Sequence, residues 1–334
     1  MKSEIEKSIV SVNFSNEPKL SEHEVDQKFN ERRTKLVPLM KNFIAQHFLF
    51  SGKKVNVTFL HAGVSSLVSI IETSEQKLIL KIPLSELNSR LEGVFLKVWE
   101  NVGVKVPHVL EEGEIGEHFY VLMEYVDSDT LSSKYKREES LEKNVYHDLG
   151  KLLRKMHEAK TEGYSNIVNK KSTPEYFSIT EWLKGDSNMQ TQVEYVKEHK
   201  LLDDEKHGSI DDVFKILISS IGDSKESVYC HNDFGGGNVF ATEPFTVFDP
   251  WPCFHHPFMD ITRSLIIISK GGVGKAGEQF LDGYFGDEKY DKKLFHAFLV
   301  LNITVKLPYM HKTKGTEKIE GLQKYLEQTK DLLV

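Results

Sequence analysis

Cysteine is scarce in this sequence, since Cys230 and Cys253 are the only two among 334 residues. Two cysteines cannot build the disulfide framework of a small secreted domain, and they fit a reducing interior. The stretch Cys253-Phe254-His255-His256 offers soft metal ligands, but no second cluster in the sequence would complete a tetrahedral zinc site. The sequence therefore predicts neither disulfide bonds nor structural zinc.

Long apolar runs and an excess of positive charge are also missing. No apolar run approaches the roughly 18 residues that a membrane span requires, and the first six residues lack the apolar core of a signal peptide. A formal net charge of −7 gives no general attraction for nucleic acid or anionic membranes, and it mildly favours a cationic ligand. We expect a cytoplasmic protein that binds neither nucleic acid nor membranes. Its oligomeric state, monomer or homodimer, stays open.

The first part of the chain changes from helical to strand periodicity. Residues 1–22 are polar, apart from a short β-like run from Ile9 to Phe14, and are expected to form an extension. The apolar spacing of residues 24–47 predicts a leading helix or helix pair, interrupted at Pro38. A later helix is expected to end at Gly103. The β-rich runs predict five strands, the first three antiparallel, over residues 55–60, 67–71, 77–82, 106–110 and 118–124.

Lys81 is the only charged residue in the apolar strand 78–82. A buried ammonium group is costly unless an anion pairs with it, so this position predicts a partner. Nucleotide phosphates would serve, and so would Glu86 or Glu92 in the following helix. The alternative is a lysine at the strand edge that reaches solvent.

The turn 61–66 contains a glycine and two serines, Ser65 and Ser66. Its backbone N–H groups could close over phosphates, although an ordinary hairpin turn has the same composition.

The richest pattern runs from His231 to Asp249. It contains His231-x-Asp233, then Asn238, then two short β-rich runs over 238–240 and 245–248 that predict a hairpin, and it ends in Asp249. Phosphoryl transfer needs a carboxylate that accepts the proton of the attacking hydroxyl, and an amide and a second carboxylate that hold magnesium. The bland alternative is turn chemistry, because Asn, Asp and Gly are common in turns.

This segment resembles the catalytic and metal-binding loops of the aminoglycoside phosphotransferase and choline kinase family. The resemblance implies an α+β, bilobal protein-kinase-like fold with a small antiparallel β-sheet N-lobe, a larger, mostly helical C-lobe and the nucleotide between them. The implied division is an extension and leading helix over 1–48, a nucleotide-binding N-lobe over 49–126 and a catalytic C-lobe over 127–334.

The resemblance also implies a role for each matched position. Lys81 binds the α and β phosphates of ATP or GTP and is positioned by Glu92. Asp233 accepts the proton of the substrate hydroxyl as it attacks the γ-phosphate. The remaining implied roles are Mg²⁺ binding by Asn238 and Asp249, phosphate covering by Ser65 and Ser66, and backbone contacts to the purine at Glu124 and Val126.

The acceptor implied by the resemblance is a small molecule with a hydroxyl group, and an aminoglycoside-type antibiotic is favoured. A metabolite kinase acting on choline, a sugar or an amino acid would share these residues. A non-catalytic nucleotide-binding module is the third alternative, and Asp249-Pro250-Trp251 argues against a protein kinase. The polar, acidic segment 178–209 is interpreted as a solvated insertion, or as a rim that attracts a cationic substrate.

Overall fold

The structure is a computed structural model that describes residues 11–18, 20, 27–61, 65–84, 92–166, 173–203, 209–269, 274–313 and 316–333. The chain divides into two compact units. The first comprises residues 1–97 and 107–127, and the second comprises residues 98–106 and 128–334. This division assigns the leading helix to the first unit, whereas the sequence had set residues 1–48 apart. No helix among these residues is long and apolar enough to cross a lipid bilayer.

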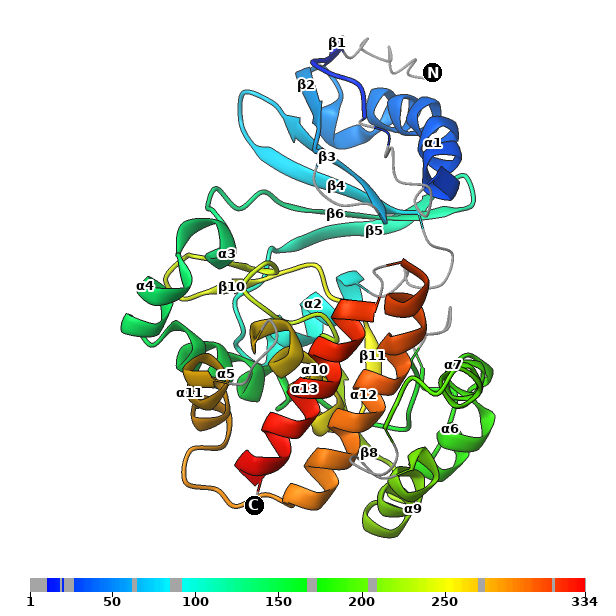
Figure 1. The fold of residues 1–334 in the computed structure, drawn as a ribbon. Helices are drawn as coiled ribbons and strands as arrows, with labels where there is room; N and C mark the ends of the chain where they lie inside the picture. The colour runs from blue at the N-terminus through cyan, green and yellow to red at the C-terminus, as the bar shows by residue number, and fades with distance from the viewer. Residues whose placement is uncertain are drawn as a thin grey trace. The chain divides into compact units, whose positions relative to one another are not determined.

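The first unit is built on a six-stranded sheet with the order β1-β2-β3-β4-β6-β5 (Figure 1). Neighbouring strands are antiparallel except for β1, which pairs with β2 in parallel. Its elements are β1 (Ser11–Phe14), α1 (Gln27–Gln46), the 3-10 helix η2 (Phe48–Phe50), β2 (Lys54–Phe59), β3 (Ser66–Glu72), β4 (Lys77–Pro83), β5 (Val109–Ile115) and β6 (His118–Glu124). The boundary between the units passes through α2 (Glu92–Asn101).

The five predicted strands are confirmed as β2 to β6, with one shift and one addition. β5 begins at Val109 rather than at residue 106. Residues 11–14, which the sequence analysis placed in an extension, form β1 along the edge of β2. An exposed strand edge carries unpaired N–H and C=O groups, and β1 satisfies those of β2. This pairing joins residues far apart in the sequence, so local periodicity does not reveal it.

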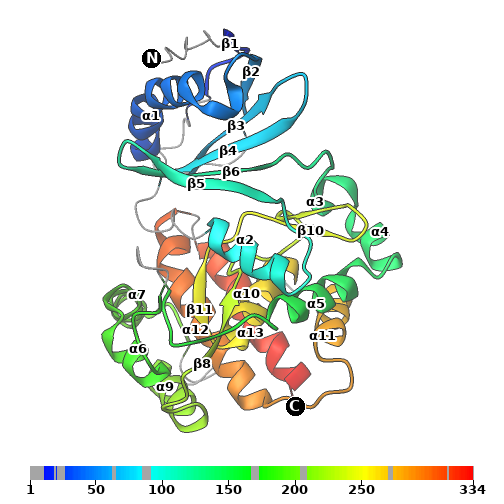
Figure 2. The ribbon, with the colours of Figure 1, turned by 180° about the vertical axis from the view of Figure 1, so that it is seen from behind.

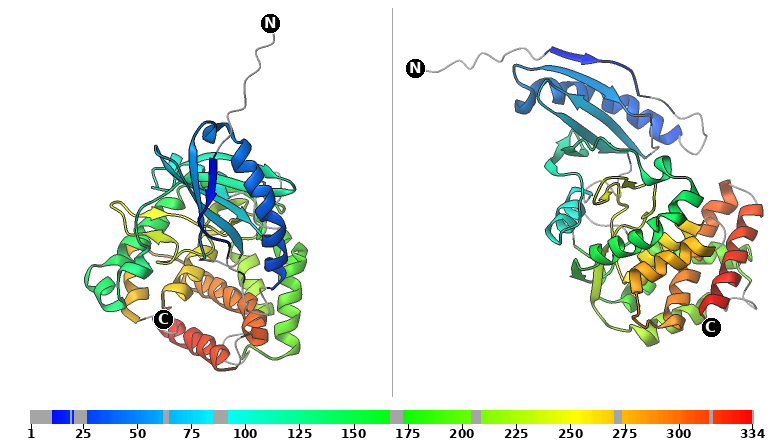
Figure 3. Two further views of the ribbon diagram at one scale, coloured as in Figure 1. Left: turned by 90° about the horizontal axis from the view of Figure 1, so that it is seen from above. Right: turned by 90° about the vertical axis from the view of Figure 1, so that its left-hand side faces the viewer.

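α1 is one continuous helix that packs on the sheet (Figure 3). Leu36, Met40 and Ile44 are fully buried among side chains of the strands. Each such side chain stabilises the fold by about 1.5–3 kcal/mol, which together exceeds the cost of about 3 kcal/mol for a proline inside a helix. The interruption predicted at Pro38 is therefore wrong.

The second unit is mostly helical. It contains a three-stranded sheet with the order β11-β8-β7 and the β9–β10 hairpin. Helices α7, α9, α10 and α13 pack against the largely buried α12 (Figure 2). Its elements are α3 (Leu131–Lys134), α4 (Arg137–Glu142), α5 (Val145–Met156), β7 (Lys160–Glu162), α6 (Ile179–Gly185), α7 (Ser187–Glu198), α9 (Ile210–Ser220), β8 (Glu226–Cys230), β9 (Val239–Phe240), β10 (Thr246–Val247), β11 (Cys253–His255), α10 (Pro257–Ser269), α11 (Gly274–Phe285), α12 (Lys292–Thr313) and α13 (Thr316–Leu333).

The segment 178–209, interpreted from its composition as a solvated insertion, is folded into this unit. Ser178 and Asp186 cap the N-termini of α6 and α7 with their side-chain oxygens, and Ser209 does the same for α9. Trp182 of α6 is completely buried. Glu181, Glu194 and Glu198 are exposed on α6 and α7, whose apolar side chains are buried, so a count of charges over the segment hid these apolar faces.

Helices α5 and α11 cross at very close range through two glycines (Figure 3). A Cβ atom on Gly150 would overlap the backbone of α11, and one on Gly283 would overlap the carbonyl oxygen of His147. This crossing fixes the C-terminal end of α5, and with it His157.

Candidate active site

The loop that follows β8 is held at its start by one buried carboxylate. Asp260, in the first turn of α10, accepts hydrogen bonds from the backbone N–H groups of His231 (2.6 Å) and Asn232 (2.8 Å). Asn232 has a φ of +60°, a left-handed conformation that asparagine tolerates better than most residues. Asp260 therefore braces the start of the loop.

Asp260 is itself held by a buried chain of hydrogen bonds. His157 Nε2 lies 3.1 Å from its Oδ2, and His157 Nδ1 lies 2.8 Å from the hydroxyl of Tyr284. Complete burial opposes ionisation, yet the hydrogen bond and charge of His157 and the N–H of Asn232 keep the pKa of Asp260 below its ordinary value. The carboxylate is therefore ionised.

The ring of His231 orients the loop and is unsuited to act as a base. Its Nε2 donates to the carbonyl oxygen of Phe248 (3.0 Å), so Nδ1 is the acceptor for the backbone N–H of Asp233 (3.3 Å). Burial lowers the pKa of the ring, which keeps it neutral. Trp99 stacks on it in parallel with 5.7 Å between ring centroids. The sequence analysis missed Trp99 because this residue carries no recognisable catalytic chemistry.

Asp233 and Asn238 are in direct contact. The Nδ2 group of Asn238 donates to the backbone carbonyl of Asp233 (2.8 Å) and to its Oδ2 (2.9 Å). Both partners can only accept hydrogen bonds, so the amide has one possible orientation and its Oδ1 faces away from Asp233. The side chain of Asp233 is exposed and accessible to a substrate.

The predicted hairpin is confirmed, and Asp249 directly follows the residue that pairs with Asn238. Val239 pairs with Val247, and the N–H of Phe248 donates to the carbonyl oxygen of Asn238 (3.1 Å). The following residue, Asp249, has a φ of +55° and is exposed. Carboxylate and amide oxygens are the ligands that Mg²⁺ prefers, so the Asp249 carboxylate and the Asn238 Oδ1 fit such an ion.

The three glycines between Asp233 and Asn238 form no left-handed turn, and the first of them, Gly235, is required for a close approach. None of them has a φ in the left-handed region. A Cβ atom on Gly235 would lie 2.7 Å from Cγ2 of Ile267 on α10, closer than real contacts allow. Gly235 lets α10 lie against the loop.

In the first unit, Lys81 on β4 forms a buried ion pair with Glu92 at the start of α2. The distance from Nζ to Oε2 is 2.5 Å, and the two residues are only 7% and 3% exposed. The alternative of a solvent-reaching lysine is wrong, and the pairing with Glu92 is confirmed. Glu86, the other candidate carboxylate, lies outside the described residues.

The other residues predicted to bind nucleotide lie at ends of strands in the first unit. Ser66 begins β3, and the carbonyl oxygen of Ser65 accepts the N–H of Leu84 (2.7 Å); residues 62–64 of the predicted phosphate turn lie outside the described part. Glu124 ends β6, and its N–H group donates to the backbone carbonyl oxygen of His108 (2.9 Å). Within the described part of the chain, the N–H of Val126 has no backbone acceptor.

Known proteins share the sequence family and the fold of this chain. A sequence model of the phosphotransferase enzyme family matches residues 56–293. No curated protein sequence matches the chain.

Solved structures of related fold include aminoglycoside phosphotransferase APH(4)-Ia, in a ternary complex with ADP and hygromycin B. It is 13% identical to this chain, with a TM-score of 0.60 over 82% of this chain and 95% of that one. A candidate fructosamine-3-kinase from Haemophilus somnus 129PT is 16% identical, with a TM-score of 0.56 over 87% and 95%. A candidate aminoglycoside phosphotransferase from Ralstonia eutropha JMP134 is 13% identical, with a TM-score of 0.51 over 88% and 98%. The predicted α+β, protein-kinase-like fold is confirmed.

Proposed function

Because the chain belongs to the phosphotransferase enzyme family, we propose that it transfers the γ-phosphate of ATP or GTP to a hydroxyl group of a small molecule, with Asp233 as the base. The observation that carries this proposal is the contact between Asp233 and Asn238 on a loop braced by Asp260. It joins an exposed carboxylate to an amide whose oxygen is directed away from it.

Asp233 is the group that would receive the proton of the attacking hydroxyl. The amide of Asn238 holds one of its oxygens, and the other stays accessible to an acceptor. His231 keeps the loop in place with both ring nitrogens engaged, so it does not compete for the proton. Most of the rate enhancement would then come from positioning and from charge stabilisation rather than from a strong base.

Asn238 and Asp249 would hold Mg²⁺, each through an oxygen. When bound, the ion would neutralise charge on the nucleotide phosphates. The register of the β9–β10 hairpin supports this pairing, since Asn238 lies opposite the residue before Asp249.

Lys81 would bind the α and β phosphates. Its ion pair with Glu92 keeps the ammonium group charged inside an apolar strand, which a phosphate-binding lysine requires. Ser65 and Ser66 would contribute from the turn before β3. The backbone of Glu124 and Val126 would bind the purine, with residues 49–126 as the nucleotide-binding part and 127–334 as the catalytic part.

An aminoglycoside-type acceptor is favoured because such molecules are polycationic and the chain carries a net charge of −7. The similar fold of a protein bound to ADP and hygromycin B supports this choice. A metabolite kinase is the second candidate, and the similarity to a candidate fructosamine-3-kinase favours an aminated sugar among its acceptors.

The test is Mg²⁺-dependent transfer of labelled phosphate from ATP and from GTP to a panel of aminoglycosides, other hydroxylated antibiotics, choline, sugars and amino acids. We expect one acceptor class to be labelled, with a kcat at least about 100-fold lower in Asp233→Asn. Asp287→Asn is the matched control, because Asp287 is exposed on the turn after α11, and it should keep full activity. Equal turnover in Asp233→Asn would refute the assigned base. Nucleotide binding without labelling of any acceptor would reduce the assignment to a nucleotide-binding module.

A further inference from the structure

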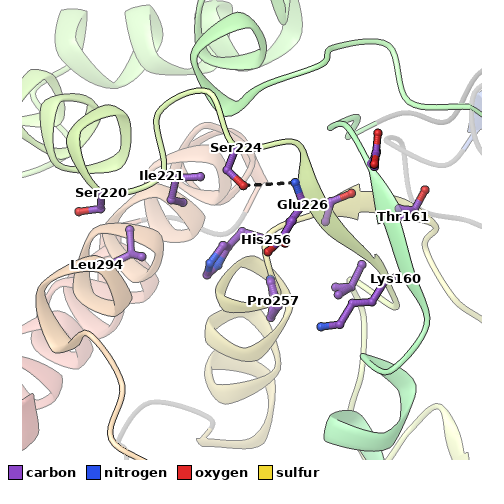
Figure 4. Close-up of a pocket in the computed structure, with 12 residues that line it drawn as sticks. Lys160, Thr161, Ser220, Ile221, Ser224, Glu226, His256, Pro257 and Leu294 are labelled. Atoms are coloured by element: carbon purple, nitrogen blue, oxygen red, sulfur yellow. Dashed lines mark hydrogen bonds between the residues drawn. The ribbon is translucent and has the colours of Figure 1, made fainter.

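The second unit contains a cavity of about 660 Å³ that the proposed function does not use. It is lined by β7, by the start of β8 and by the segment after α9, and the first turns of α10 and α12 complete it (Figure 4). Its volume lies in the range of about 300–1,000 Å³ that is typical of sites for small organic ligands. Its apolar walls include the buried side chains of Val228 and Leu294.

Two glutamates occupy opposite positions on the strands that line this cavity. Glu162 on β7 lies directly opposite Glu226 on β8 in the antiparallel register. Like charges in this position destabilise a sheet unless a cation lies near them. Among the described residues, neither glutamate forms an ion pair with a basic side chain, and Lys160, which also lines the cavity, has no carboxylate partner.

Hydrogen-bond donors gather at the start of α10. His256 Nδ1 accepts the N–H of Phe258 (3.1 Å), which leaves the proton of the neutral ring on Nε2. Figure 4 shows His256 and Pro257 at the first turn of α10, with Lys160 on the neighbouring strand β7. The N-terminus of a helix of this length carries a partial positive charge that favours anions. Burial lowers the pKa of His256 to about 3, so the ring stays neutral.

A buried hydroxyl group adds to this set. Ser227, which lines the cavity and is 2% exposed, has an Oγ atom without a hydrogen-bond partner in the described structure. A buried polar atom in that state costs about 1–3 kcal/mol, and rotation about a single bond would let it meet a polar group in the cavity.

We propose that this cavity is a second ligand site that binds a small zwitterion of the amino-acid type. The ammonium group of the ligand lies between Glu162 and Glu226. Its acid group is bound by Lys160 and the Nε2–H of His256 at the start of α10. Its aliphatic part contacts the apolar wall.

Both elements that start at this cavity also lead to the catalytic loop: β8 at its other end, and α10 through its own first turn. β8 runs from Glu226 directly into His231, and α10 carries Asp260, the carboxylate that binds the loop backbone, one turn after Pro257. A ligand that bridges β8 and α10 would therefore restrain the loop and alter its rate of local opening.

The experiment is isothermal titration of the full chain with each of the common protein amino acids, without nucleotide or acceptor. We expect saturable binding of at least one of them with one site per chain. Its affinity should fall by at least about tenfold in Glu226→Gln and in Lys160→Met. Glu138→Gln, an exposed glutamate on α4, is the matched control and should bind like the wild type. Thermal unfolding serves as the check of folding, and Glu226→Gln should unfold at the same or a higher temperature because it removes the like-charge pair.

Two results would overturn the second site: no saturable binding by any amino acid, or equal binding by the wild type and both cavity variants. Hydrogen exchange supplies the second readout, since ligand should slow the exchange of residues 226–233 in the wild type and not in Glu226→Gln. The titration requires no turnover. Failure of the proposed phosphotransfer would therefore leave this result intact, and the converse also holds.

Discussion

Replacing Asp260 with asparagine changes one atom of the carboxylate that accepts hydrogen bonds from the backbone of the catalytic loop. The carboxylate accepts three hydrogen bonds with its two oxygens: from His231 N–H and His157 on Oδ2, and from Asn232 N–H on Oδ1. Asparagine has the same shape, but one of these oxygens becomes an NH₂ group that must face an N–H donor.

The magnitude follows from counting these bonds. In the better of the two amide orientations, the oxygen keeps the bonds from His231 and His157, and the NH₂ group confronts the N–H of Asn232. One hydrogen bond to a charged acceptor is lost, at about 1.5–3 kcal/mol, and two buried donors are left without acceptors. The two surviving bonds weaken because their acceptor is now neutral. We expect Asp260→Asn to lower the free energy of unfolding by roughly 3–5 kcal/mol.

The assay is urea denaturation beside phosphotransfer kinetics, with Ser264→Ala as the matched control. Ser264 is buried on the same helix, and its hydroxyl group has no hydrogen-bond partner within the described residues, so its removal should change stability by less than about 1 kcal/mol. Displacement of the loop should also lower kcat by about 100-fold in Asp260→Asn at temperatures where it is folded. An unfolding free energy within about 1 kcal/mol of the wild type would refute the bracing role.

The pH dependence of stability gives a second test of Asp260. Its pKa is lowered in the folded state, so its contribution to stability is present above the unfolded value of 3.8 and is lost as pH falls through the folded value. The difference in unfolding free energy between the wild type and Asp260→Asn should therefore shrink in strongly acidic solution. A constant difference down to the acid transition would contradict an ionised Asp260.

The remaining predictions concern packing, the buried ion pair and acid stability. Gly283→Ala should lower the free energy of unfolding by at least about 2 kcal/mol in urea titrations, because the new methyl group would overlap the backbone of α5. Gly321→Ala on α13 is the control, and it should be neutral or stabilising because a Cβ atom at Gly321 meets open space. Lys81→Met should lower the free energy of unfolding by about 3–5 kcal/mol, because Glu92 stays buried without its lysine. The double variant Lys81→Met/Glu92→Gln should recover part of that loss, and strictly additive effects of the two substitutions would contradict the pairing. Burial lowers the pKa of His255 from 6.5 to about 3, so the neutral ring contributes its full share of the free energy of unfolding above pH 6.5. Between pH 6.5 and about 3, the free energy of unfolding should fall by about 1.4 kcal/mol per pH unit because of this residue. His255→Phe should reduce that slope.

Contacts between residues that are close in the sequence could be predicted without the structure. The spacing of Asp233, Asn238 and Asp249 around a two-strand pattern predicted a hairpin that brings their neighbours together, and the structure has that hairpin. The solitary Lys81 in an apolar strand predicted a buried anionic partner because burial of a lone charge is prohibitive. These inferences rest on residues within about twenty positions of one another, where chain geometry limits the possible arrangements.

By itself, the sequence determined the order of strands β2 to β6, the β9–β10 hairpin and the need for a counter-ion at Lys81. Only the tertiary structure decided that Asp260 braces the loop, that β1 joins the sheet and that α6, α7 and α9 are packed rather than solvated. The physical reason is that these outcomes depend on contacts between segments far apart in the chain. Local periodicity and composition record which face of an element is apolar, and tertiary packing alone selects what covers that face.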